Sequence, residues 1–450
     1  MERKRALPES IAKDIEEATS SLLPKKSRDA YYKELNYFNN RNQENNVLVQ
    51  ILKRSHSFKN LNTNAIVLGI ETSCDDTGCA VVDTNGSILG EALHSQQLFH
   101  LANGGIIPPF AQDLHRQNIE NVVNTAIEQA NIRFEDLHAI ATTVKPGLPL
   151  SLTIGMKYGK YLCWRYNKPF IPIHHMEAHA LTARMHNKHV TFPFLVLLIS
   201  GGHCLLAVAQ DIDKFLLLGT TLDDAPGEAF DKVSRRMKLR NIAEYSQLSG
   251  GQAIELAASK ASDVLQFKFT TPLLQYKNCN FSMAGLKTQV QRHILTEEKK
   301  HDVQPDGVIP HINNLCAGFQ LGVTRHLCQR VQRGMTFVKR ENIIPKSKQT
   351  LVVSGGVACN NFIAKGLQLV CDEMEYYLVR PPPKLCTDNG VMIAWNGIER
   401  WRANLGILHD FLDVQIESSS PLGVSLIQDV IKHNISCKWT KLTELTQPRV

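Results

Sequence analysis

Short apolar runs and longer stretches of helical periodicity alternate through the part of the chain that follows residue 65. Apolar runs bounded by turn residues predict strands, and Asn85-Gly86 is the turn signal of a β-hairpin. Apolar residues spaced three and four apart predict helices. The predicted elements are strands at 66–70, 79–83 and 87–95, a helix at 107–132, a strand at 139–143 and a helix ending near Tyr166.

The same pattern then repeats. Strands are predicted at 194–200, 204–210 and 215–220, helices from Gly227, from Gly251 and from Met283 through the 320s, and a strand at 351–353. Three strands, a helix, a strand and a helix make one half of an actin-like ATPase lobe. The repeat therefore predicts an α/β protein with a two-lobed actin-like ATPase (ASKHA) fold and a ligand cleft between the lobes.

The pattern also divides the chain into predicted parts. Residues 1–46 mix acidic and basic side chains and are expected to form a helical extension, which is either a fused segment or absent from the mature protein. Residues 47–64 contain basic but no acidic side chains, as a transit peptide or a plain basic linker does. Lobe I is expected at 65–175, joined by C-terminal helices near 386–425. Lobe II is expected at 176–385 and a tail at 426–450.

Composition narrows the class of protein. With 43% hydrophobic and 21% charged residues the chain is typical of a globular protein, and no apolar run approaches the ~18 residues that a membrane span needs. The net charge of +7 is mild evidence for a polyanionic partner. The 11 cysteines include no Cys-x-x-Cys pair, which favours reduced thiols. Cys74 is either a reactive thiol or a small residue fitted into a tight turn.

Two histidines give the strongest chemical signal. His175 and His179 are four residues apart, a spacing that places both imidazoles on one face of a helix, within reach of one cation. Asp388, in a polar loop that opens an apolar helix, is the best distant candidate for a third ligand. Glu177 does not follow the first histidine directly, so the geometry disfavours a His-Glu-x-x-His metalloprotease. A purely structural histidine pair is the alternative.

Three Ser-Gly-Gly turns lie next to predicted strands or helices. They are Ser200-Gly201-Gly202, Ser249-Gly250-Gly251 and Ser354-Gly355-Gly356. Glycine pairs let backbone amides approach an anion, and a helix N-terminus adds its dipole. Together with the acidic turn Asp75-Asp76 they favour a nucleotide phosphate or acyl phosphate over ordinary tight turns. The chain has no P-loop motif, which excludes that class of nucleotide-binding protein.

Seven motifs, in order, resemble the TsaD family. They are Ile70–Thr77, Pro146-Gly147-Leu148, His174–His179, Leu198–His203, Gly227–Lys232, Ser354–Asn360 and Cys386–Gly390. The resemblance covers residues 65–425 and is greatest to the mitochondrial branch. It implies transfer of a threonylcarbamoyl group from threonylcarbamoyl-AMP to N6 of the adenosine beside the anticodon in tRNAs reading ANN codons, which forms t6A.

The resemblance also implies site residues. One divalent metal ion per subunit, iron or zinc, would be held by His175, His179 and Asp388. The donor threonylcarbamoyl-AMP would be held by Leu198, Ile199, Ser200, Gly201, Gly202, Asp231, Gly251 and Asn360. One motif departs from the family pattern, because Met283 and Ala284 replace the usual aromatic and hydroxyl residues.

The donor is a mixed anhydride that an amine can attack without a protein nucleophile. We expect Asp75 or Asp76 to remove the proton of the attacking amine; the alternative is a structural carboxylate that caps the turn. A catalytically silent nucleotide-binding scaffold and a sugar-kinase-like phosphotransferase are the competing functions. The resemblance further implies a homodimer in the mitochondrial matrix, with tRNA as partner and a threonylcarbamoyl-AMP synthase upstream.

Overall fold

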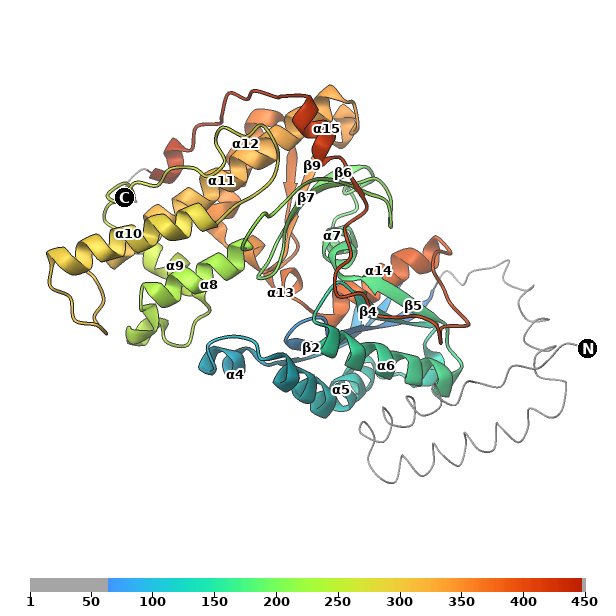
Figure 1. Cartoon of the computed structure of the whole chain (residues 1–450). Helices are drawn as coiled ribbons and strands as arrows, with labels where there is room; N and C mark the ends of the chain where they lie inside the picture. The colour runs from blue at the N-terminus through green and yellow to red at the C-terminus, as the bar shows by residue number, and fades with distance from the viewer. Residues whose placement is uncertain (1–63, 447–450) are drawn as a thin grey trace, which may run out of the picture. The chain divides into compact units, whose positions relative to one another are not determined.

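The computed structural model describes residues 64–446 (Figure 1). The predicted extension at 1–46, nearly all of the linker at 47–64 and the last four residues of the predicted tail lie outside the described residues. No helix in the described range has the length and apolar character that a membrane crossing requires.

The first sheet has five strands in the order β3-β2-β1-β4-β5. Its strands are β1 (Ile66–Glu71), β2 (Asp76–Asp83), β3 (Ile88–Ser95), β4 (Ala139–Lys145) and β5 (Phe170–His174). β1 runs antiparallel to β2 and parallel to β4, so the sheet is mixed. Helices α5 (Pro108–Ala130) and α6 (Pro149–Tyr166) cover one face, and α14 (Gly390–Arg402) packs against the other (Figure 1). The short helix α4 (Gln97–Ala102) precedes α5.

The second sheet has six strands in the order β10-β9-β6-β7-β8-β11. They are β6 (Phe194–Ile199), β7 (Cys204–Ala209), β8 (Phe215–Thr220), β9 (Thr350–Ser354), β10 (Tyr377–Val379) and β11 (Val424–Ser425). The helices that follow them are α8 (Pro226–Arg236), α9 (Gly250–Ser259), α10 (Ala284–Lys300), α11 (Ile312–Arg340), α12 (Asn361–Met374), α13 (Pro383–Cys386) and α15 (Ile427–Lys432).

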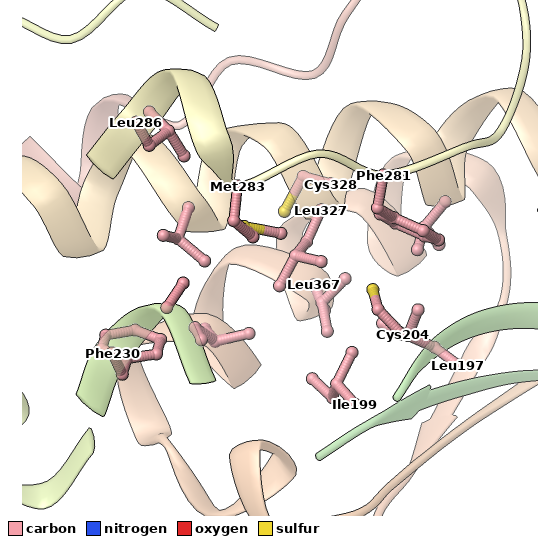
Figure 2. Close-up of a cluster of buried hydrophobic side chains, with 14 of the residues drawn as sticks. Leu197, Ile199, Cys204, Phe230, Phe281, Met283, Leu286, Leu327, Cys328 and Leu367 are labelled. Atoms are coloured by element: carbon pink, nitrogen blue, oxygen red, sulfur yellow. The ribbon is translucent and has the colours of Figure 1, made fainter. Parts of the chain in front are cut away.

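A continuous apolar core joins this sheet to its helices. Phe230 from α8, Leu327 from α11 and Leu367 from α12 meet Ile199 at the end of β6 (Figure 2). Each of these side chains is almost completely buried. Burial of a side chain of this size stabilises the fold by about 1.5–3 kcal/mol, so the core fixes the strand ends from which the candidate site loops leave.

The fold class is confirmed, because each half of the described chain begins with a three-stranded meander and continues with helices and parallel strands. Several details differ from the prediction, among them the start of β2 at Asp76 and the helices α4, α12 and α15, which were not predicted. β5 was not expected, the helical stretch from Met283 divides into α10 and α11, and β10 and β11 are too short to show a pattern. The lobe boundaries at 65–175 and 176–385 stay predictions.

Candidate metal and donor site

The loop that carries Asp388 is held by the close packing of α14 on β1 and β2. A Cβ atom on Gly390 would lie 2.3 Å from the carbonyl carbon of Cys79, and one on Gly69 would lie 2.2 Å from the amide nitrogen of Ala394. Only glycine allows this approach of backbone to backbone. The side-chain oxygen of Asn389 accepts a hydrogen bond from the Met392 amide at 2.9 Å and caps the helix.

Helix α7 (His175–His186) begins directly after β5 and presents both predicted histidines to this loop. Nε2 of His179 lies 3.0 Å from Oδ1 of Asp388, and Nε2 of His175 lies 3.4 Å from the same oxygen. The ligand atoms of the three residues all lie within 4.8 Å of one another. The structure thus brings together two imidazole nitrogens and one carboxylate oxygen, a donor set that suits a divalent transition metal.

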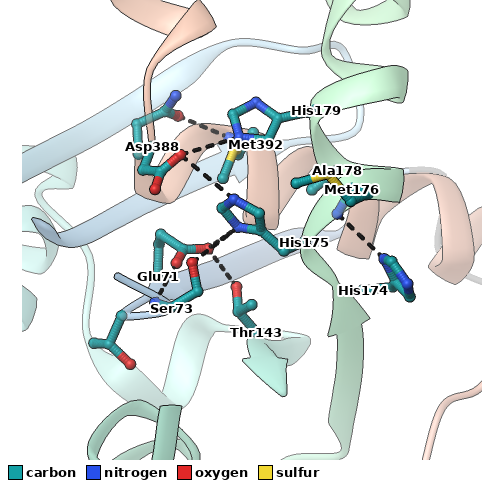
Figure 3. Close-up of polar contacts among 12 residues, drawn as sticks. Glu71, Ser73, Thr143, His174, His175, Met176, Ala178, His179, Asp388 and Met392 are labelled. Carbon is teal, nitrogen blue, oxygen red and sulfur yellow. Dashed lines mark hydrogen bonds and ion pairs between the residues drawn. The ribbon is translucent and has the colours of Figure 1, made fainter. Parts of the chain in front are cut away.

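Glu71 completes the cluster and was not predicted from the sequence. Its side chain is fully buried at the end of β1. Oε2 accepts a hydrogen bond from the Thr143 hydroxyl and lies 3.1 Å from Nδ1 of His175 (Figure 3). A carboxylate at Nδ1 keeps the proton on that nitrogen and leaves Nε2 free to bind a metal. The sequence does contain a signal for this role, because Glu71 ends an otherwise apolar strand, and a buried glutamate needs a partner for its charge.

The charges of the cluster favour a cation. Burial lowers the pKa of His175, but the carboxylates of Asp388 and Glu71 outweigh it and raise that pKa to about 10. Burial raises the pKa of Asp388, yet the charge of His175 brings it well below the ordinary value. Burial lowers the pKa of the neighbouring His203 to about 4, with His175 adding to the effect, so this imidazole is neutral at pH 7.

Glu177 points away from this cluster, as predicted from its position on the helix. Its Oε2 accepts a hydrogen bond of 2.6 Å from the Arg400 guanidinium on α14. Both side chains are buried, and the pair links α7 to α14. A glutamate engaged in this way cannot act as the base of a metalloprotease.

Asp75 lies in the turn between β1 and β2, and Asp76 is the first residue of β2, close enough to Asp388 to feel its charge. Oδ1 of Asp76 is buried and has no hydrogen-bond partner among residues 64–446. Burial raises the pKa of Asp76 to about 7, with a smaller contribution from the charges of Asp75 and Asp388. A carboxyl group with this pKa can accept a proton near neutral pH.

Two of the predicted Ser-Gly-Gly turns leave neighbouring strands. β6 and β9 are parallel, and Leu198 pairs with Ser354, so both turns emerge at the same edge of the sheet. A Cβ atom added to Gly201 or to Gly202 would have no atom within 4 Å, which means that this backbone faces open space. The side chains of Leu198 and Ile199 are buried in the strand, so these two predicted residues could contact a donor only through their backbone.

Of the remaining predicted donor residues, Gly251 and Asn360 lie at helix N-termini, and Asp231, in the middle of α8, contacts one of these N-termini. Asp231 on α8 accepts a hydrogen bond of 2.9 Å from the amide of Gly250, where α9 begins, and Gly251 follows with open space beside it. Asn360 caps α12 through its side-chain oxygen, which accepts from the Ile363 amide at 3.0 Å. The side-chain amide nitrogen of Asn360 is then the group that could donate a hydrogen bond to a ligand.

The unusual motif residue Met283 is explained by packing. Its side chain is fully buried in the core beside Leu286 (Figure 2), so the missing aromatic changes the core and not a ligand contact.

The nearby basic side chains of α8 are largely neutralised within the chain. Lys232 pairs with Asp224, and Arg236 pairs with Glu298.

Comparison with known proteins identifies the family. The family model described as TsaD, tRNA N6-adenosine threonylcarbamoyltransferase, matches residues 87–395. A Mus musculus protein named tRNA N6-adenosine threonylcarbamoyltransferase, mitochondrial, is 49% identical over 384 residues, which cover 85% of this chain and 92% of the relative. The chain belongs to the TsaD family.

Other TsaD relatives carry similar names. The Xenopus tropicalis protein, also named mitochondrial, is 51% identical over 84% of this chain and 93% of its own length. The Drosophila melanogaster protein, named a probable mitochondrial enzyme of this activity, is 46% identical over 83% of this chain and 92% of its own length. The TsaD resemblance inferred from the seven motifs is therefore confirmed.

Proposed function

We propose that this chain is a mitochondrial tRNA N6-adenosine threonylcarbamoyltransferase that forms t6A. It transfers the threonylcarbamoyl group of threonylcarbamoyl-AMP to N6 of the adenosine beside the anticodon in tRNAs reading ANN codons. Membership of the TsaD family and the names of relatives that match most of its length support this activity. The single observation that carries the proposal is the meeting of His175, His179 and Asp388 at one point.

The reaction needs placement more than covalent catalysis. The adenine N6 amine attacks the carbamoyl carbon of the donor, a new C–N bond forms, and the C–O bond to the phosphate of AMP breaks. One proton must leave the nitrogen, and AMP departs as a stable anion. A rigid site that orients amine and carbonyl therefore supplies a large part of the rate enhancement.

Backbone amides would hold the AMP part of the donor. We assign this role to Ser200, Gly201 and Gly202 because they leave β6 and the two glycines face open space. The N-terminus of α9 at Gly251 adds a favourable dipole for a phosphate. Asp231 and Asn360, at α8 and α12, would accept and donate hydrogen bonds to the ribose and base.

We assign the proton-accepting role to Asp76 in preference to Asp75. The Asp76 carboxyl has a buried oxygen without a partner in the described residues and a pKa raised by burial to about 7. Asp75 then serves to orient the turn. An acceptor of this pKa changes charge in the range in which the reaction must run.

The residues fit a divalent ion, which we take to be iron or zinc. Two imidazoles and one carboxylate leave a coordination position open, as catalytic metal sites do. When bound, such an ion supplies Lewis-acid stabilisation and an anchor for a carboxylate or carbonyl oxygen of the donor. Within the chain, Glu71 would orient His175 through Nδ1, and the carboxylate of Asp388 lies beside Nε2 of both histidines.

The relatives' names place their activity in mitochondria, and we propose the same location for this chain. We further propose that it acts as a homodimer and receives its donor from a threonylcarbamoyl-AMP synthase. Light scattering of the purified protein tests the homodimer directly.

The proposal is tested by transfer of radiolabelled threonine to tRNA. Purified protein is supplied with the donor-forming enzyme, ATP, bicarbonate and an ANN-decoding transcript. The matched control is the same transcript with guanosine in place of the adenosine beside the anticodon. Label on the first transcript alone supports the function. No label from folded, metal-loaded protein would favour a nucleotide-binding scaffold instead.

A further inference from the structure

Two cysteines come together at a point where the candidate donor and metal loops meet. Cys359 ends the short helix η5 (Gly356–Cys359), immediately before Asn360, and Cys386 ends α13, two residues before Asp388. The two helical turns contact each other. The Cys386 thiol donates a hydrogen bond to the Pro381 carbonyl at 3.3 Å, and the Cys359 thiol donates one to the Pro383 carbonyl at 3.6 Å, so both thiols are held by the same proline loop.

A cavity of about 560 Å³ has both cysteines in its lining. It is lined by the proline loop Pro381–Pro383, by the end of α7 at His186, and by the two cysteines. Cys359 is half-buried, whereas Cys386 lies behind it, 1% exposed. An attacking reagent would therefore meet Cys359 first.

The surroundings of Cys359 favour a reactive thiolate. The neighbouring Cys386 side chain and the charge of Arg380 lower the pKa of Cys359 to about 7, against the effect of burial. The Arg380 guanidinium is fixed beside the thiol, because it donates a hydrogen bond of 2.9 Å to the Ala358 carbonyl. By contrast, burial and the charge of Asp75 raise the pKa of Cys74 well above its ordinary value, which favours the packing interpretation of that residue.

We propose that Cys359 and Cys386 form a peroxide-sensitive thiol pair that closes to a disulfide across the two site loops. The Cys359 thiolate attacks the peroxide O–O bond and becomes a sulfenic acid as the leaving oxygen takes up a proton to form water. The sulfur of Cys386 then attacks the sulfenic sulfur, an S–S bond forms, and the second oxygen leaves as water. In sum two thiols lose two hydrogen atoms, and one peroxide becomes two waters.

A disulfide here would alter both candidate loops. Bonded sulfurs lie about 2.05 Å apart, so the disulfide would hold η5 and α13 against each other. Asn360 follows Cys359 directly, and Asp388 lies two residues after Cys386. Oxidation is therefore expected to lower the rate of threonylcarbamoyl transfer. This expectation rests on the proposed function, whereas formation of the cross-link is independent of it.

Peptide mapping after peroxide treatment tests the pair. Full-length protein is treated with hydrogen peroxide, remaining thiols are alkylated, and the digest is searched for a peptide joining Cys359 to Cys386. We expect this cross-link, its reversal by dithiothreitol, and continued alkylation of the half-buried Cys437. Oxidation of Cys359 without a cross-link, or preferential oxidation of Cys437, would overturn the proposal.

Two variants make the result specific. In Cys386→Ser the sulfenic acid of Cys359 has no thiol to resolve it, so a dimedone adduct should accumulate on Cys359. In Cys359→Ser neither cross-link nor adduct should form, and transfer should become resistant to peroxide. If the cross-link forms while transfer is unchanged, the disulfide stands and its effect on the site is refuted.

Discussion

Oε2 of Glu71 lies 3.1 Å from Nδ1 of His175, although 104 positions separate the two residues in the chain. This contact joins the end of β1 to the first residue of α7, and it determines which nitrogen of the imidazole carries a proton. The proposed ligand set therefore depends on a residue that would not itself bind the metal.

Glu71→Gln should weaken metal binding by about 10- to 100-fold, because the amide removes a negative charge and no longer fixes the tautomer. Competition between the purified protein and a chelator for zinc measures the affinity. Glu177→Gln is the matched control on α7, since Glu177 binds Arg400 on the opposite side. Equal loss of affinity in both variants would refute an orienting role for Glu71.

Asp76→Asn should abolish transfer and, near pH 8, raise stability. The pKa of Asp76 is raised by burial to about 7 from 3.8, so its stabilising effect is present below pH 3.8 and is lost as the pH rises to 7. Asparagine removes that penalty. Thermal unfolding of both proteins between pH 4 and pH 8 should show a growing advantage for the variant. A constant difference would show that Asp76 is not the titrating group.

Gly201→Ala should weaken donor binding without loss of stability. The added methyl group meets no atom within 4 Å in the protein, so it can clash only with a ligand. We expect a higher KM for the donor at an unchanged melting temperature. Gly285→Ala, whose Cβ would meet only the Pro272 side chain at 3.9 Å, is the control. An unchanged KM would place the donor elsewhere.

Gly390→Ala should destabilise the protein, because the new methyl group would lie 2.3–2.5 Å from the backbone of Cys79 and Ala80, which cannot rotate away. Overpacking of this kind costs about 1–3 kcal/mol. Urea unfolding measures the change. Gly356→Ala, with 3.9 Å to the nearest atom, should be close to neutral. Similar unfolding midpoints for the two variants would contradict the packing of α14.

Features that depend on neighbouring residues in the chain could be predicted from the sequence. The i, i+4 spacing of His175 and His179 predicted one helix face, and the polar loop before an apolar helix pointed to Asp388. The strand–turn units at Ser200 and Ser354 were recognised individually, and the parallel pairing of β6 and β9 then placed them at one sheet edge.

Contacts that depend on tertiary structure were missed. The role of Glu71 depends on the placement of β1 against α7, which no local pattern encodes. β5 was missed because five residues containing Pro172 read poorly as a strand. The long helical stretch was not divided because the break lies at residues 301–311, where Asp302 and His311 adopt left-handed conformations.

The proposed function is tested most directly by the t6A content of tRNA after reaction with wild-type protein, His179→Ala and His189→Ala, measured by mass spectrometry of nucleosides. His189 is an exposed histidine just beyond α7 and controls for the loss of an imidazole. We expect t6A with wild type and His189→Ala, and none with His179→Ala at normal folding. Equal t6A from all three proteins would contradict a reaction centred on His175, His179 and Asp388.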